Sequence, residues 1–236
     1  MTRRYLSAAA AVLSGLALAA CDNSSSEAPV ELGKDYYPLK VGAERVYNVV
    51  DKTYNNNQVT STTTGQIREQ LTETYPDAAG VLTYKLVRSS RATAADAWRV
   101  DSAQTITVNE RNLLLTRSNW RTVELIFPVR TGATWNRNAF NDRNQLTQAY
   151  RRYQDVGASF TAGSRSYDNT ITVYDDNPEV NNVFYEFTIR QVYAKGIGPV
   201  FREQLTLRYC DGTGAPCPVA VKYITTGKTH TETLVQ

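Results

Sequence analysis

Residues 183–209 read VFYEFTIRQVYAKGIGPVFREQLTLRY, and this stretch decides the fold of the chain. Both halves alternate apolar and polar residues, which is the period of a β-strand. The intervening Gly196-Ile197-Gly198-Pro199 is typical of a tight turn. We therefore expect a hairpin of two antiparallel strands. Its first strand should present Val183, Tyr185, Phe187, Ile189 and Tyr193 on one face, and its second should present Phe201, Leu205, Leu207 and Tyr209.

The same alternation, rich in Thr, Val, Tyr and Ile, recurs along most of the chain after residue 30. Residues 144–155 fit a helix or a strand, and we favour a strand; residues 92–97 fit a helical turn or a loop. Ten or more strands joined by short turns imply a sheet that curls or closes. The sequence predicts an all-β, mostly antiparallel domain, either a curved sheet, an incomplete barrel or a sandwich. The other expected strands are 46–54, 58–75 (with a break possible at Gly65), 81–89, 98–101, 105–109, 113–117, 122–127, 167–174 and 219–226.

The N-terminus has the pattern of a bacterial lipoprotein signal. Arg3 and Arg4 precede an apolar run over residues 8–20, which ends directly before Cys21. The run is shorter than the roughly 20 residues that span a bilayer. We expect a signal peptide at 1–20, a lipidated Cys21 with a flexible tether over 21–34, and a single β domain over 35–236.

Composition restricts the function classes. With 26 Lys and Arg against 23 Asp and Glu, the chain lacks the strongly basic balance of a nucleic-acid binder. Outside the cytoplasm, Cys210 and Cys217 are expected to form a disulfide across a turn-rich loop. The single histidine, His230, is expected in an exposed tail, so we predict no metal site, and the absence of a phosphate-cradling glycine motif gives no support for a nucleotide cofactor.

Basic and aromatic residues concentrate between residues 111 and 152. Eight arginines and two tryptophans lie there with two acidic residues. One interpretation is a surface for anionic headgroups, glycans or an acidic partner. The other is the outer faces of strands, with arginine stems covering apolar surface. The possible binding surface comprises Arg117, Trp120, Arg121, Arg130, Trp135 and Arg137.

One phrase occurs twice: YPLKVG at 37–42 and FPVRTG at 127–132. It is either a mark of duplication or a recurring local turn. With the lipobox, GATWN at 132–136 and KGIG at 195–198, it resembles a group of uncharacterised Bacteroidetes-type envelope lipoproteins. That group carries Asn and Trp where this chain has Ala43 and Arg45, and the resemblance implies no catalytic residue.

These observations favour a non-enzymatic envelope lipoprotein with a binding or structural β domain. It would be anchored through the lipid on Cys21, in the outer rather than the inner membrane, and its partner would be an envelope protein, glycan or lipid. The alternative is a carrier or chaperone for lipid or lipoprotein, with an acyl chain in a concave sheet. A glycan-active enzyme has less support, because no pair of facing carboxylates stands out.

Overall fold

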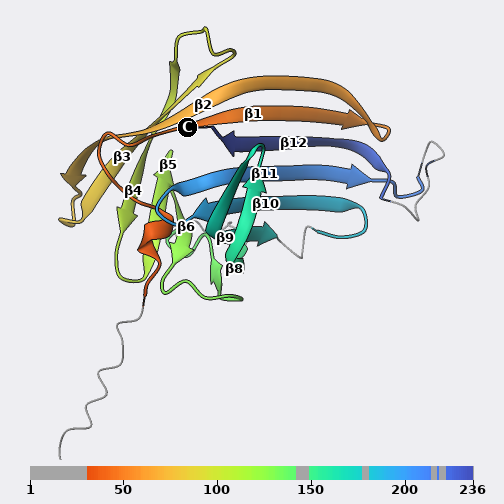
Figure 1. Ribbon diagram of the computed structural model, residues 1–236. Coiled ribbons are helices and arrows are strands. Elements are labelled where there is room, and N and C mark those ends of the chain that lie inside the picture. Colours follow the sequence, from red (N-terminus) through yellow and green to blue (C-terminus); the bar gives the residue numbers. More distant parts are fainter. Residues whose placement is uncertain (1–30, 142–148, 177–180, 214–216, 218–221, 236) are drawn as a thin grey trace, which may run out of the picture. The chain divides into compact units, whose positions relative to one another are not determined.

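The computed structural model describes residues 31–141, 149–176, 181–213, 217 and 222–235 (Figure 1). The predicted signal, Cys21 and most of the tether lie outside these residues. The chain divides into Met1–Glu31 and a compact unit, Leu32–Gln236. The compact unit includes Leu32, whose carbonyl accepts a hydrogen bond from Val129 N–H at 3.1 Å.

The compact unit is all-β, as predicted. In the described part of the chain, the only helix is a short 3-10 helix, η1 (Lys34–Tyr36), and no helix there is long and apolar enough to cross a membrane. Residues 92–97 form a loop with a turn, and β2 runs through Gly65. The strands are β1 (Glu44–Asn55), β2 (Gln58–Pro76), β3 (Leu82–Arg91), β4 (Arg99–Val108), β5 (Asn112–Arg117), β6 (Trp120–Ile126), β7 (Thr134–Asn136), β8 (Tyr150–Ala162), β9 (Arg165–Asp176), β10 (Tyr185–Ala194), β11 (Gly198–Tyr209) and β12 (Ile224–Leu234).

All twelve strands form one antiparallel sheet. Its order is β6-β5-β4-β3-β2-β1-β12-β11-β10-β9-β8-β7, so two six-stranded meanders meet where β1 pairs with β12. The sheet curls until its two edges approach each other: the N–H of Val123 in β6 donates to the carbonyl of Arg137, just after β7, at 2.9 Å. The result is a nearly closed, barrel-like sheet (Figure 1), and the predicted incomplete barrel describes it better than a sandwich.

The two copies of the repeated phrase have matching structures. Gly42 and Gly132 have φ angles of 87° and 77°, and each phrase leads into the first strand of a meander. The match extends past the turn to the paired strand, which favours the duplication interpretation. The corresponding backbone bonds are Ala43 N–H to Lys40 O (3.0 Å) with Ala133 N–H to Arg130 O (3.2 Å), Gly42 N–H to Leu71 O (2.7 Å) with Gly132 N–H to Tyr153 O (3.0 Å), and Leu71 N–H to Ala43 O (3.0 Å) with Tyr153 N–H to Ala133 O (3.0 Å).

The protein's own side chains pack a large apolar core inside the curled sheet. The segment around η1 contributes to it, and the ring of Tyr37 lies 6.1 Å from that of Tyr193. Burial of this apolar surface is the main stabilising contribution to the fold. The buried members are Tyr36, Tyr37, Leu71, Leu86, Ile106, Leu113, Leu114, Val123, Leu125, Phe127, Trp135, Tyr153, Ile171, Val173 and Tyr193.

The β8–β9 hairpin bends sharply and covers part of the outer face. A bulge separates its two halves, with positive φ at Asp155 (51°) and Gly157 (81°). Beyond the bulge, the ring of Phe160 packs 5.3 Å from that of Phe201 in β11. Figure 1 shows the hairpin crossing in front of β10, β11 and β12. The bend thus creates a second apolar cluster outside the main core.

The predicted hairpin of β10 and β11 is present, and the apolar sets of its two strands lie on opposite faces of the sheet. Ile189 lies opposite Gln204, and Thr188 lies opposite Leu205. Residues that are opposite in adjacent strands share a face, so Leu205 lies on the other face from Ile189. The cause is a register shift at Val192 and Tyr193, where one extra residue reverses the alternation.

Cys210 and Cys217 are bonded as predicted. Their Cα atoms are 6.0 Å apart, within the range of disulfides. The bond joins the end of β11 to the segment before β12.

Candidate functional site

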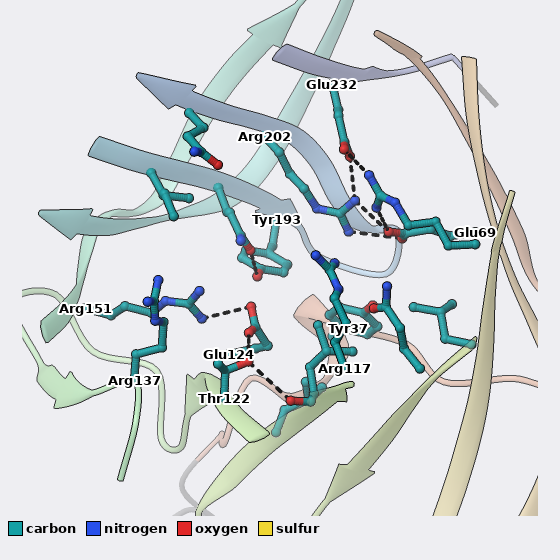
Figure 2. Close-up of a pocket in the computed structure, with 18 of the residues that line it drawn as sticks. Tyr37, Glu69, Arg117, Thr122, Glu124, Arg137, Arg151, Tyr193, Arg202 and Glu232 are labelled. Atoms are coloured by element: carbon teal, nitrogen blue, oxygen red, sulfur yellow. Dashed lines mark hydrogen bonds and ion pairs between the residues drawn. The ribbon is translucent and has the colours of Figure 1, made fainter. Parts of the chain in front are cut away.

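A polar cavity of about 410 Å³ lies inside the curled sheet (Figure 2). Strands β2 to β6, β8 and β10 to β12 all contribute side chains to its wall. Its volume is in the range of small-molecule sites. Unlike the apolar core, its lining is dominated by arginine, glutamate and glutamine side chains. We take this cavity as the candidate functional site.

The first group of charges on its wall, here called the Glu69 cluster, consists of Glu69, Glu232, Arg88 and Arg202. Arg202 makes a two-pronged contact with Glu69, with Nη1–Oε1 at 2.7 Å and Nη2–Oε2 at 3.0 Å. Arg88 Nη1 lies 2.7 Å from Glu69 Oε1, and Arg202 Nη1 lies 2.8 Å from Glu232 Oε2. Arg88 also pairs with Glu232. Each carboxylate thus bridges two guanidinium groups.

The cluster is held in its ionised form. Burial acts to raise the pKa of Glu69, but Arg202 and Arg88 outweigh it and hold that pKa below its ordinary value. Burial likewise opposes the charge of Glu232, and Arg202, His230 and Arg88 lower its pKa well below the usual range. Arg202 is held charged by Glu69, although burial works against it. These groups are therefore fully charged at neutral pH.

The second group, here called the Glu124 cluster, consists of Glu124, Arg151, Asp175 and Arg137. Arg151 Nη1 lies 2.8 Å from Glu124 Oε2, and its Nε lies 3.5 Å from Asp175 Oδ2. Asp175 also pairs with Arg137. Burial acts to raise the pKa of Glu124, but Arg151 and a hydrogen bond from the Thr122 hydroxyl (2.6 Å) lower it overall.

The two clusters occupy equivalent places in the two meanders. Glu69 lies opposite Arg45 in the β1–β2 pair, and Arg151 lies opposite Trp135 in the β7–β8 pair. Arg45 and Trp135 follow the repeated glycines at the same offset. These equivalent positions thus hold Glu69 in one meander and Arg151 in the other. Each of the two residues pairs with side chains of opposite charge.

Arg117, at the end of β5, lines the cavity between the two clusters (Figure 2). The amide of Gln104, turned so that its oxygen faces the guanidinium, accepts hydrogen bonds from Arg117 Nε at 3.0 Å and Nη2 at 3.2 Å. Burial, together with Arg88 and Arg202, lowers the pKa of Arg117. No carboxylate within the described ranges forms an ion pair with this arginine, although its side chain remains accessible.

His230 is not in a tail. It lies in β12 on the cavity wall, with Nδ1 2.7 Å from Asp51 Oδ1 and Nε2 3.0 Å from Glu232 Oε1. The hydrogen bond to Glu232 raises its pKa; burial opposes this shift and Asp51 adds to it. The net charge of the cavity wall therefore changes with pH near neutrality, as His230 gains or loses its proton.

The structure separates the six residues of the predicted binding surface. Arg117, Trp120 and Arg137 line the cavity. Trp135 is buried in the apolar core, where its Nε1–H donates to the Val123 carbonyl at 2.9 Å. Arg121 and Arg130 are exposed and do not line the cavity. Half of the predicted set thus meets inside the sheet rather than on one outer surface.

Comparison with protein-family models, with curated proteins and with solved structures gave no match. The resemblance to Bacteroidetes-type lipoproteins stays a prediction.

No group of three or more His, Cys, Asp and Glu within the described ranges is arranged to hold a metal ion. In the acidic stretch 175–179, Asp175 pairs with Arg137 and Arg151. Residues 177–179 lie outside the described residues.

Sequence reasoning missed most of the charged wall, including Glu69, Arg88, Glu124, Arg151, Arg202 and Glu232. One signal was available: a charge placed on the apolar face of a strand. Glu69, for instance, shares a face with Ile67 and Leu71, and Arg151 shares one with Tyr153. A charge in that position must find a buried partner or line a polar cavity.

Proposed function

We propose that the protein is an envelope lipoprotein, anchored through Cys21, whose β domain binds a small polar ligand without transforming it. The observation that carries the proposal is the cavity of about 410 Å³ with its charged wall. A domain that needed only to fold would fill this space with apolar side chains, because buried ion pairs contribute little net stability. Retaining so many charges around an open space favours a role in binding.

The protonation states support a binding role over a catalytic one. General acid–base chemistry works best with a group whose pKa lies near the operating pH. Arginine neighbours instead hold the carboxyl pKa values of Glu69, Glu124 and Glu232 below their ordinary values. Each of these carboxylates is engaged by arginine, which suits a fixed recognition surface.

The cavity does not favour the alternative of an acyl-chain carrier. Its wall is charged, and an acyl chain seated there would remove the ion pairs from water without replacing their hydrogen bonds. The apolar interior that could have held such a chain is packed with the protein's own tyrosine, leucine and phenylalanine side chains.

The proposal is tested by a thermal-shift screen of small polar metabolites and saccharides against the wild type and Leu115→Trp. Leu115 lines the cavity, and an indole there occupies the space next to Arg117. Since a ligand that binds only the folded state raises the melting temperature, hits should stabilise the wild type and not the variant. Hits that stabilise both proteins equally would place binding elsewhere.

A further inference from the structure

We infer that the ligand is a small molecule with a single negative charge and several hydroxyl groups, the chemistry of an acidic sugar, and that Arg117 binds its carboxylate. This inference rests on the proposed function and names the substrate class of the same cavity. Three observations carry it: the charge balance, the geometry of Arg117 and the neutral polar groups near it.

The charged side chains of the cavity wall include one more cation than their ion pairs account for. The two clusters contain four arginines (Arg88, Arg202, Arg137 and Arg151) and four carboxylates (Glu69, Glu232, Glu124 and Asp175), and every one of them is paired. Glu203 pairs with Arg190 near the wall, and Asp51 is balanced by His230 when that histidine is protonated. Arg117 is the additional charge.

Arg117 is exposed in the empty cavity, but it shares the wall with Arg88 and Arg202 and has no carboxylate partner among the described residues, so an anion would reduce the repulsion among these guanidinium groups. The lowered pKa of Arg117 has the same physical cause, because burial and two neighbouring arginines act on its guanidinium. An anion beside Arg117 would remove this penalty.

The geometry prepares Arg117 for a carboxylate. Gln104 is buried, and its amide oxygen accepts from Nε and Nη2 of the guanidinium. These two bonds fix the plane of the group, and in the described residues nothing accepts a hydrogen bond from Nη1. A guanidinium held in one plane suits two-pronged binding of a carboxylate. Because the wall has one surplus charge, a monoanion matches it better than a phosphate monoester, which carries between one and two charges at neutral pH.

Neutral groups surround this position. Trp120 lies directly opposite Arg117 in the β5–β6 hairpin, so both side chains face the cavity. Across the cavity, β10 and β11 contribute the amides of Gln191 and Gln204. Amides both donate to and accept from hydroxyl groups. An anion with a hydroxylated ring would match the guanidinium, the aromatic ring and the amides together.

The test is titration calorimetry of the full-length protein in detergent, in phosphate-free buffer at pH 7, with glucuronate, glucose and glucose 6-phosphate. We expect glucuronate to bind the wild type at least about tenfold more tightly than either other probe, since a hydrogen bond to a charged group discriminates by this order. Arg117→Gln should lose about tenfold or more in glucuronate affinity, and Arg117→Lys should lose less.

The matched control is Arg121→Gln, because Arg121 belongs to the same hairpin but is exposed and absent from the cavity wall. Its affinity should equal that of the wild type. Circular dichroism and melting of each variant check folding, and Arg117→Lys keeps the test valid if Arg117→Gln does not fold.

Two groups of outcomes would overturn the inference. Equal binding of glucose and glucuronate, or preference for glucose 6-phosphate, would reject the acidic-sugar inference. If Leu115→Trp abolished the binding of those probes, the proposed function of the cavity would still stand. Failure of all three probes to bind the wild type would also reject the acidic-sugar inference. The thermal-shift screen would then decide separately whether the cavity binds any ligand.

Discussion

Glu69 is the residue whose charge holds one side of the cavity together. It is 3% exposed, and its two oxygens engage both Arg88 and Arg202. A buried carboxylate in this position costs desolvation that only its partners offset. Without Glu69, the two half-buried guanidinium groups of Arg88 and Arg202 would share the single carboxylate of Glu232.

We therefore predict that Glu69→Gln lowers the free energy of unfolding by about 2–4 kcal/mol, because it leaves buried charge unbalanced. Urea unfolding followed by circular dichroism measures this change. The matched control is Glu73→Gln in the same strand, whose pair with Lys85 is exposed at 2.9 Å. We expect no measurable change there. Equal effects of the two substitutions would contradict the structural role of the Glu69 cluster.

His230 gives the fold a specific pH dependence. Hydrogen bonds to Glu232 and Asp51 raise its folded-state pKa above the unfolded value of about 6.5. A raised pKa means that protonated His230 stabilises the folded state. This contribution is complete below about pH 6.5 and disappears as the pH rises through the folded-state pKa.

The prediction is that the difference in unfolding free energy between the wild type and His230→Gln is largest below about pH 6 and declines as the pH rises above about 6.5. Denaturant unfolding of both proteins at closely spaced pH values measures it. A difference that grew with pH would reverse the assigned sign and contradict the contacts of His230.

At the scale of elements, the bend in the β8–β9 hairpin decides what covers the outer face of the sheet. Gly157 has φ of 81°, a conformation that costs a β-branched residue about 1–2 kcal/mol. A Cβ there would meet nothing within 4 Å, so only backbone strain opposes a substitution.

Gly157→Val should release the outer half of this hairpin from β11 while the cavity strands keep their structure. Hydrogen exchange should rise in residues 158–170 and around Phe201, the partner of Phe160. Ala158→Val is the control, since Ala158 is exposed and its φ angle is not positive. Unchanged exchange in residues 158–170 would contradict the account of the bend.

Strands were the most predictable feature of this chain, and their register was the least. Alternation identifies a strand because side chains point to opposite faces in turn. A bulge reverses that alternation without a strong local signal, which explains why Leu205 and Leu207 lie on the other face of the sheet from Ile189. The bend at Asp155 and Gly157 escaped prediction for the same reason: it coincides with register shifts in the β8–β9 pair that alternation does not signal.

At the scale of the whole molecule, the cavity wall depends on strands far apart in the sequence. Arg202 meets Glu69 across 133 positions, and Arg88 meets Glu232 across 144. Nothing local in the sequence pairs such residues, because their contact depends on the strand order of the closed sheet. Arg117, Trp120 and Arg137 were predicted as binding residues because they lie close together in the sequence, on β5, on β6 and just after β7.

The proposed anchor makes a separate prediction at this scale. Cys21→Ser should move the protein from the membrane pellet to the soluble fraction, because it removes the residue that would carry the lipid. Fractionation after a high-salt wash, with metabolic labelling by a fatty acid, measures both consequences. The control is Cys210→Ser with Cys217→Ser, which removes the disulfide and should leave the protein in the membrane. Retention of Cys21→Ser in the washed pellet would contradict the anchor.

The central claim is that the charged cavity is a ligand site, and native mass spectrometry of the protein extracted gently from its own membranes tests it most directly. The account predicts a stoichiometric small molecule on the wild type that is released on unfolding and absent from Leu115→Trp. A wild-type protein without ligand, or a ligand retained equally by Leu115→Trp, would contradict it.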